Sequence, residues 1–141
     1  MELMVAVAIM GITMAIGVPG MQTIITSSRL TTSANDMVAS LQMARSEAIK
    51  RIQNSGVSIT SNDWVTFVST SSNVIQQFSA AKGVNLVVTG GNNDDTPTYR
   101  PDGRLDANVP VTMTFTATAD SSQQRILTIS PSGRVSVVAL P

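Results

Sequence analysis

The feature that most constrains this chain is an uncharged, apolar segment close to its amino terminus. No charged residue occurs between positions 3 and 28, and residues 3–25 read LMVAVAIMGITMAIGVPGMQTII. As a helix rising about 1.5 Å per residue, this segment spans roughly 34 Å, which is enough to cross a hydrocarbon core of about 30 Å. The whole chain has 141 residues, too few to cover so much apolar surface on all sides. We therefore expect a membrane-spanning helix rather than a buried core helix, with Pro19 kinking or locally melting it.

A one-sided apolar stripe predicts that the helix continues beyond Ser28. Its members recur at steps of three and four residues, as one face of a helix requires. The stripe consists of Leu30, Ala34, Met37, Leu41, Ala44, Ala48 and Ile52. Lys50 and Arg51 occupy the last predicted turn, where the helix dipole favours cations, and Glu47 is spaced to pair with Arg51. The segment Asn54-Ser55-Gly56 is the predicted stop of the helix.

From Val57 onward the hydrophobic period changes to two, which is typical of strands. The clearest case is VTMTFTATA over 111–119, whose odd-numbered residues are apolar and whose even-numbered residues are threonines. Pro101-Asp102-Gly103 and Pro131-Ser132-Gly133 are predicted turns. The predicted strands are Val57–Thr60, Trp64–Val68, Val74–Phe78, Val84–Thr89, Thr98–Arg100, Val111–Ala119, Arg125–Ser130 and Arg134–Ala139. The aromatic residues on them, Trp64, Phe67, Phe78 and Phe115, are predicted to fill the core.

These patterns predict an α+β fold in which one long N-terminal helix packs on two small antiparallel sheets. Residues 1–27 form the predicted transmembrane half of the helix, and residues 28–141 form the folded domain. Within that domain, 28–53 is the amphipathic half of the helix and 57–141 is the β domain. The change from a helix that is apolar all round to one that is apolar on one side indicates a helix that leaves a membrane and docks on a domain.

The composition excludes most enzyme chemistry, because the chain contains no His and no Cys. Ser-His-Asp and Cys-His catalysis, thiolate or imidazole zinc sites, haem ligation and disulfides are thereby excluded. No phosphate-binding glycine motif occurs. Nine Lys and Arg balance nine Asp and Glu, so the overall charge gives no reason to expect a nucleic acid partner. We predict a protein that is not an enzyme, and we assign no catalytic residue, metal ligand or cofactor.

Two charged clusters allow a functional and a structural interpretation. The first comprises the loop acids Asp94, Asp95, Asp102 and Asp106. Calcium takes such oxygen ligands, but no twelve-residue calcium loop is present and loop Asp residues commonly serve turns. The second comprises Arg45, Glu47, Lys50 and Arg51, which either contact a neighbouring subunit or form a solvated helix face.

Four segments carry a resemblance to a known family. The start, ELMVAVAIMGITMAIGVPGMQ, resembles the N-terminal helix of type IV pilins and type II secretion pseudopilins, with an acid at Glu2 and a proline at Pro19. The segment LQMARSEAIKR resembles the helix signature of the GspH/FimT family of minor pilins and pseudopilins. YRPDGRL and ILTISPSGRVSVV look like that family's two late strand-turn motifs. The four segments occur in the family's order and cover nearly the whole chain, so the resemblance implies a pilin-like fold.

The resemblance also implies roles for two residues of the helix. Glu2 would neutralise the free amino terminus of a neighbouring subunit in the filament core, which gives a physical reason for an acid beside an apolar segment. The alternative is that the Glu2 carboxylate simply lies among the lipid headgroups at the end of a membrane-spanning helix. Pro19 would permit local unwinding as subunits pack. Family precursors carry a basic leader, a Gly-Phe junction and a methylated first residue; Met1 directly precedes Glu2 here, so we assign no processing site.

The leading function implied by the resemblance is that of a minor pilin in a type IV filament system. The chain would be a single-pass protein of a Gram-negative inner membrane with its domain in the periplasm. It would contact the assembly platform and other pilins or pseudopilins, and join the tip complex that primes assembly. A type II secretion pseudopilin (protein H) is the close alternative.

A DNA-binding minor pilin for natural transformation is the second alternative. Some members of this family, which resemble the competence pilins, bind DNA through a C-terminal Gly-Arg-x-Arg motif on the last hairpin. Here the matching residues are Gly133, Arg134, Val135 and Ser136, so the second arginine is a serine. The candidate DNA-binding residues are Arg134, Arg125 and Arg104. We predict weak DNA binding or none.

Overall fold

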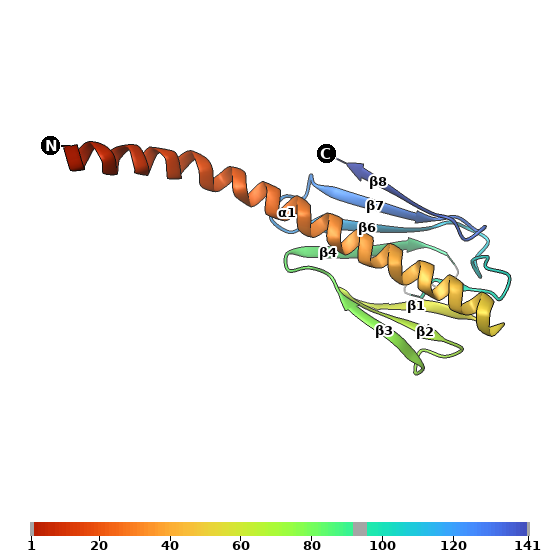
Figure 1. Cartoon of the computed structure of the whole chain (residues 1–141). Coiled ribbons are helices and arrows are strands. Elements are labelled where there is room, and N and C mark those ends of the chain that lie inside the picture. The colour runs from red at the N-terminus through yellow and green to blue at the C-terminus, as the bar shows by residue number, and fades with distance from the viewer. Residues whose placement is uncertain (1, 92–95, 141) are drawn as a thin grey trace.

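In its described residues, the computed structural model consists of one helix of 50 residues and eight strands. The structure describes residues 2–91 and 96–140, except for the side chains of residue 2 and residues 16–20. The helix α1 (Glu2–Arg51) projects from the domain with its first half and lies across the strands with its second half (Figure 1). The helix is continuous through residue 19, so it is not melted at Pro19 as the sequence had suggested.

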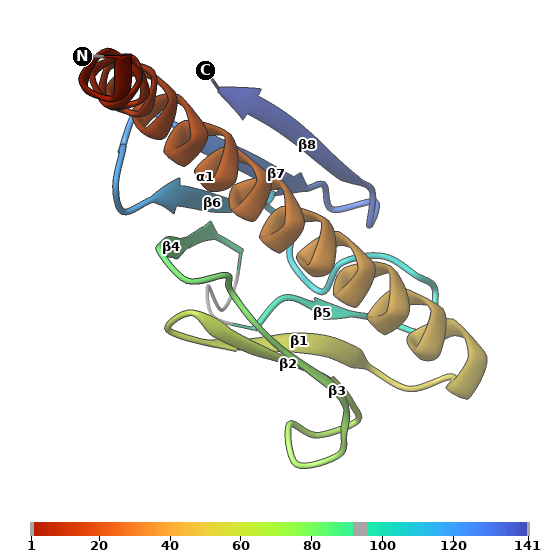
Figure 2. The ribbon, with the colours of Figure 1, turned by 60° about the vertical axis from the view of Figure 1, so that its left-hand side comes forward.

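The strands form two antiparallel sheets, as predicted, and in the described part of the chain each sheet has four strands. The first sheet has the order β3-β2-β1-β5 and the second has the order β4-β6-β7-β8. The second half of α1 lies over both sheets (Figure 2). A hydrogen bond from the Leu86 amide to Asn62 Oδ1, 3.1 Å long, joins the two sheets. The strands are β1 (Ser55–Thr60), β2 (Asp63–Val68), β3 (Val74–Ser79), β4 (Val84–Gly90), β5 (Thr98–Tyr99), β6 (Val111–Ala117), β7 (Gln124–Ile129) and β8 (Val135–Leu140).

All eight predicted strands are present, with ends that differ from the prediction by two residues at most. The largest differences are at the start of β1 and at the end of β6. The odd-numbered residues of β6 are buried from Val111 to Ala117, as its alternation predicted. Ala119 was expected on the same buried face, but the strand ends before it and Ala119 is exposed. The turn of residues 118–123 takes the chain away from the core at this point.

The predicted stripe of α1 is buried except at its last member. Its residues from Leu30 to Ala48 are at most 1% exposed, whereas Ile52 is 77% exposed. The expectation for Ile52 was wrong because the helix ends at Arg51 and Ile52 has a positive φ of 54°. The Gln53 amide donates to the carbonyl of Ala48, which closes the helix with a Schellman-type bond.

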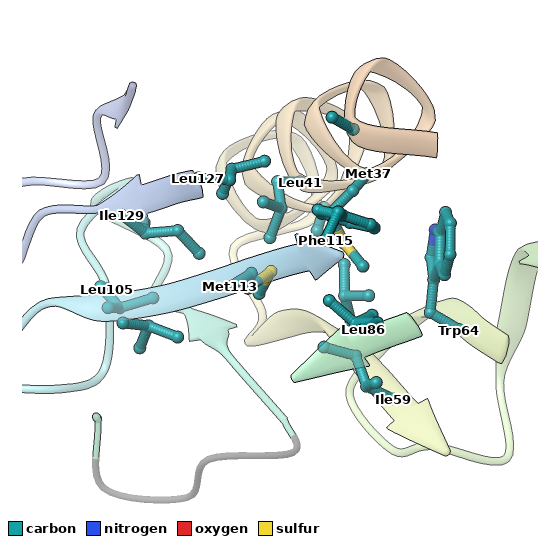
Figure 3. Close-up of a cluster of buried hydrophobic side chains, with 14 of the residues drawn as sticks. Met37, Leu41, Ile59, Trp64, Leu86, Leu105, Met113, Phe115, Leu127 and Ile129 are labelled. Carbon is teal, nitrogen blue, oxygen red and sulfur yellow. The ribbon is translucent and has the colours of Figure 1, made fainter. Parts of the chain in front are cut away.

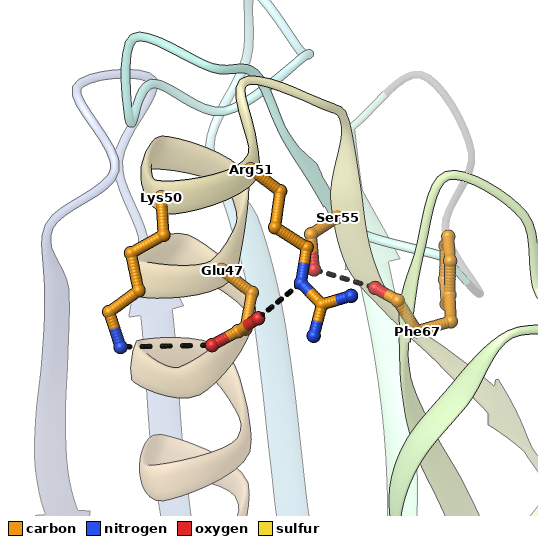
Figure 4. Close-up of polar contacts among 5 residues, drawn as sticks. All are labelled: Glu47, Lys50, Arg51, Ser55 and Phe67. Atoms are coloured by element: carbon orange, nitrogen blue, oxygen red, sulfur yellow. Dashed lines mark hydrogen bonds and ion pairs between the residues drawn. The ribbon is translucent and has the colours of Figure 1, made fainter.

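The predicted stop at Asn54-Ser55-Gly56 was therefore placed too late, since Ser55 and Gly56 already belong to β1. Gly56 serves a close approach instead of a helix cap: a Cβ at this position would lie 2.7 Å from the carbonyl oxygen of Pro97. The Ser55 hydroxyl donates to the Phe67 carbonyl at 2.6 Å, so the first residue of β1 is anchored to β2 (Figure 4).

The core lies between α1 and the two sheets, and it is shared by both (Figure 3). Met37 and Leu41 of the helix meet Phe115 and Leu127 of one sheet, and Trp64 of the other. The indole of Trp64 stacks on Phe78 and meets Phe115 edge-on, with centroid separations of 6.1 and 6.3 Å. Its Nε1–H donates to the Ser40 hydroxyl of α1 at 3.0 Å, so the one polar atom of this large buried side chain is satisfied. The prediction of an aromatic core is confirmed for Trp64 and Phe115, whereas Phe78 is only partly buried against the core and Phe67 is buried outside this cluster.

Candidate functional site

The exposed apolar surface of α1 is the first functional feature of the molecule. In the part of its first half whose side chains are described, the large apolar residues are exposed, from 78% at Leu3 to 45% at Ile25. Residues exposed in this way are Leu3, Met4, Val5, Val7, Ile9, Met10, Ile12, Met14, Met21, Ile24 and Ile25. An exposed apolar surface of this size marks an interaction site or a membrane-facing surface. The part of α1 that carries residues 3–15 projects beyond the described strands of the domain (Figure 1).

The membrane span and the two assembly residues remain predictions. Within the described residues, no helix reaches the combination of length and hydropathy that a membrane crossing requires. Glu2 and Pro19 both belong to α1, but their side chains lie outside the described residues.

Two turns that are far apart in the sequence meet beside the last turns of α1. A Cβ on Gly133 would lie 2.3 Å from the Gly103 carbonyl oxygen, and the Leu105 amide donates to the Pro131 carbonyl at 3.1 Å. Both glycines have positive φ, 76° at Gly103 and 80° at Gly133, as their turns require. The motifs YRPDGRL and ILTISPSGRVSVV are therefore in direct contact.

Arg45 ties these turns to the helix, a role that the sequence did not indicate. Its Nε donates to the Gly103 carbonyl oxygen at 2.9 Å, across 58 positions of the chain. Tyr99 is fully buried beside them, and burial raises the pKa of its hydroxyl to about 12, although the charge of Arg45 acts in the opposite direction. The phenol therefore stays neutral at physiological pH. The residues Arg45, Tyr99, Gly103 and Gly133 form what we call the motif cluster.

The three candidate DNA-binding residues do not form one patch. The register of the last hairpin pairs Arg125 with Ala139, whereas Arg134 lies beside Ser130 at the turn. The two arginines are thus about five residues apart along the hairpin, or roughly 17 Å. The register of the hairpin therefore keeps these two candidates apart. Arg104 and Arg134 do lie at the same end of the domain, because each follows one of the two touching glycines.

The cations of the chain divide between the two ends of the domain. We call the end with the last turns of α1 and the motif cluster the distal end. The end where α1 leaves the sheets is called the proximal end. The cations at the distal end are Arg45, Lys50, Arg51, Arg100, Arg104 and Arg134. Those at the proximal end are Arg29, Lys82 and Arg125. The Arg29 guanidinium contacts the Lys82 carbonyl, and the Arg125 guanidinium contacts the Ser27 hydroxyl.

Several distal cations are engaged with acids. Glu47 contacts Arg51 at 2.7 Å and Lys50 at 3.7 Å (Figure 4), and the hydrogen bond from Arg51 is the main cause that lowers the pKa of this carboxyl. Arg100 pairs with Asp106 at 2.7 Å. The predicted charged helix face is therefore present. Arg45 points toward the Gly103 carbonyl, and Glu47, Lys50 and Arg51 form a network of ion pairs. Contact of this face with a neighbouring subunit remains a prediction.

The loop acids considered for calcium serve turns where the structure describes them. Asp102 accepts the Arg104 amide at 2.9 Å, and Asp106 holds Arg100. Asp94 and Asp95 lie outside the described residues. Among the residues that are described, no three His, Cys, Asp or Glu side chains are grouped as a metal site would require.

A long helix with a projecting apolar half, packed on two four-stranded antiparallel sheets, defines the pilin-like class of fold. The chain belongs to the GspH family: the family model described as type II transport protein GspH matches residues 33–133. That match spans most of the amphipathic half of α1, the strands β1 to β7 and both turns of the motif cluster. A comparison of the sequence with curated proteins found no match.

Solved structures with the same fold include proteins of two filament systems. The type IV minor pilin FimU of Pseudomonas aeruginosa is 19% identical, with a TM-score of 0.69 over 79% of this chain and 89% of that chain. The minor pseudopilin EpsH of the Vibrio cholerae type 2 secretion system is also 19% identical, with a TM-score of 0.63 over 79% and 97%. GspH of E. coli is 14% identical, with a TM-score of 0.64 over 81% and 90%. At these identities the similarity establishes the fold alone.

Proposed function

We propose that this chain is a minor subunit of a type IV filament system, held in the inner membrane by the first half of α1. The observation that carries the proposal is the exposed apolar surface between Leu3 and Ile25. Lipid covers such a surface before assembly, and the helices of neighbouring subunits cover it afterwards. The role is structural: the subunit joins other minor subunits at the filament tip, and the domain, with its motif cluster, presents surfaces to them in the periplasm.

A pseudopilin of a type II secretion system is the alternative within the same proposal. The family description favours secretion, whereas the similarity of fold extends to a minor pilin as well as to pseudopilins. Both kinds of subunit need the same helix and the same domain. The sequence features that we identified are shared by both systems.

Deletion of the gene distinguishes the two systems. We expect the deletion strain to lose nearly all surface pili, measured by shearing and immunoblotting of the major pilin, while secretion of folded exoproteins is unchanged. Re-expression of the chain should restore piliation. The reverse pattern, normal pili with loss of exoprotein secretion, would establish the pseudopilin alternative. Normal behaviour in both assays would contradict the proposal.

Weak DNA binding at the distal end is a second candidate, favoured by the six cations gathered there. Non-specific DNA affinity depends on the number of neutralised phosphates. Glu47, Asp102 and Asp106 offset part of this charge, and Arg125 is at the other end of the domain. We therefore expect little affinity for duplex DNA at physiological salt.

We predict that Ser136→Arg strengthens whatever DNA binding the full chain shows in detergent micelles, because it adds one phosphate contact next to Arg134. Each additional phosphate contact should also steepen the plot of the logarithm of the binding constant against the logarithm of the salt concentration by about one unit of slope. Electrophoretic shift assays at low and physiological salt measure both quantities. Tight binding by the unaltered chain that is lost in Arg134→Ala would make DNA uptake the leading function.

A further inference from the structure

The proximal end of the domain surrounds α1 at the point where the helix leaves the sheets. The turns of residues 80–83 and 118–123 and the end of β8 flank the helix there (Figures 1 and 2). Arg29 Nη1 donates to the Lys82 carbonyl at 3.3 Å, which links the helix to the first of these turns. Arg125 Nη2 approaches the Ser27 hydroxyl at 3.4 Å. One turn of α1 is thereby fixed among polar groups, directly beyond the exposed apolar surface.

Two hollows open beside the helix in this region, and they share Gln22 and Thr26. The larger has a volume of about 280 Å³ and the smaller about 150 Å³. The larger is lined by Gln22, Ile25, Thr26 and Arg29. The smaller is lined by Gln22, Thr23, Thr26, Ala119, Asp120 and Gln123. Because the two share residues, a single ligand can extend from one hollow into the other.

The two hollows carry opposite charges. Arg29 has five N–H donors and uses one of them on the Lys82 carbonyl, so others are available to an anion in the larger hollow. Asp120 Oδ1 accepts two hydrogen bonds from Ser122, and Oδ2 accepts one from Gln123 at 3.3 Å. These bonds, chiefly those from Ser122, lower the pKa of the Asp120 carboxyl, so it is ionised near neutral pH. A carboxylate has about four acceptor positions, which leaves Oδ2 capacity for one more donor.

We propose that the two hollows together bind the headgroup of phosphatidylethanolamine, with its phosphate at Arg29 and its ammonium at Asp120. The inference rests on the proposed function, since residues 3–25 as a membrane span place residues 22–29 at the depth of the headgroups. Phosphatidylcholine has a phosphate but no N–H to donate to Asp120. Phosphatidylglycerol has a phosphate but no cation. The opposite charges of the site therefore select the zwitterion that can donate hydrogen bonds.

Lipid retention by the full chain tests this proposal. The chain is reconstituted into nanodiscs with equal amounts of the three phospholipids and released in mild detergent, and the retained lipids are counted by native mass spectrometry. We expect phosphatidylethanolamine to exceed phosphatidylcholine by about two- to five-fold, the effect of an exposed ion pair. Asp120→Asn keeps one oxygen to accept from Ser122, but it removes the charge and replaces the second oxygen by an NH2 donor, so it should bring this ratio close to one. Arg29→Gln should lower the retention of all three lipids.

Asp63→Asn is the matched control for Asp120→Asn, and Lys82→Gln is the matched control for Arg29→Gln. Both make the same change in charge at the proximal end, but neither residue lines a hollow. Both should leave the lipid ratio unchanged. Three results would overturn the lipid proposal without contradicting the proposed membrane anchor. They are equal retention of the three lipids, a preference for phosphatidylglycerol, and an unchanged lipid ratio in Asp120→Asn. A chain that fails to insert into nanodiscs would overturn the proposed function, and this inference with it.

Discussion

Glu2→Ala is expected to leave membrane insertion intact and to abolish incorporation of the subunit into filaments. Removing a carboxylate makes the apolar segment more apolar, so insertion should not suffer. The positive amino terminus of a neighbouring subunit would lose its counter-ion in a low-dielectric helix bundle, and an uncompensated buried charge is strongly unfavourable, by about 3–5 kcal/mol. At 1.4 kcal/mol per factor of ten, a loss of about 100-fold or more in incorporation follows.

The measurement compares the amount of the subunit in sheared filaments with its amount in membranes. Glu2→Asp keeps the charge and should retain part of the incorporation. Asp36→Ala removes an acid from the same helix, off the buried stripe, and should behave like the unaltered chain. Filaments that contain Glu2→Ala at the normal level would contradict the proposed role of the acid, and loss of the variant from membranes would contradict the reasoning on insertion.

Gly133→Ala is expected to destabilise the domain by roughly 2–5 kcal/mol. A φ of 80° costs a residue with a Cβ about 1–2 kcal/mol. The new Cβ would also lie 2.3 Å from the Gly103 carbonyl oxygen, which is a backbone atom that cannot rotate away. Separating the two turns to relieve this contact costs about 1–3 kcal/mol of packing. It would also disturb the hydrogen bond from Arg45 to the Gly103 carbonyl.

Gly83→Ala is the matched control, because Gly83 has a φ of 82° and no atom within 4 Å of a built Cβ. It should cost only about 1–2 kcal/mol, from the backbone conformation alone. The free energy of unfolding of both variants is measured by urea denaturation followed by the fluorescence of Trp64. Equal losses in the two variants would show that the contact between the two turns does not stabilise the domain.

The elements of this fold were predictable because their signals are local. A helical stripe from Leu30 to Ala48 and the alternation of β6 follow from side-chain periods of 3.6 and 2, which any short window of sequence contains. The exposed apolar half of α1 is local in the same sense, since an uncharged run with no amphipathic stripe has no face to pack on its own domain. The family resemblance added the order of the segments and the candidate roles of Glu2 and Pro19.

The end of α1 and the positions of the arginines depended on tertiary structure. Nothing in the residues around Ile52 favours a positive φ there, yet the start of β1 needs the chain to turn at that point so that Ser55 can bond to Phe67. The separation of Arg125 from Arg134 is set by the register of the hairpin of β7 and β8. A shift of this register by one residue would give each arginine a different neighbour on the opposite strand.

The sequence by itself determined a long helix with an apolar first half, eight strands and the residues that form the core, because each of these depends on neighbours a few positions away. Only the tertiary structure brought Arg45 to Gly103 and Gly103 to Gly133, and placed Asp120 beside Gln22 and Thr26 of α1. These contacts join residues dozens of positions apart. They arise from the packing of two sheets on one helix. The periodicity of a short stretch of sequence cannot predict contacts between residues so far apart in the chain.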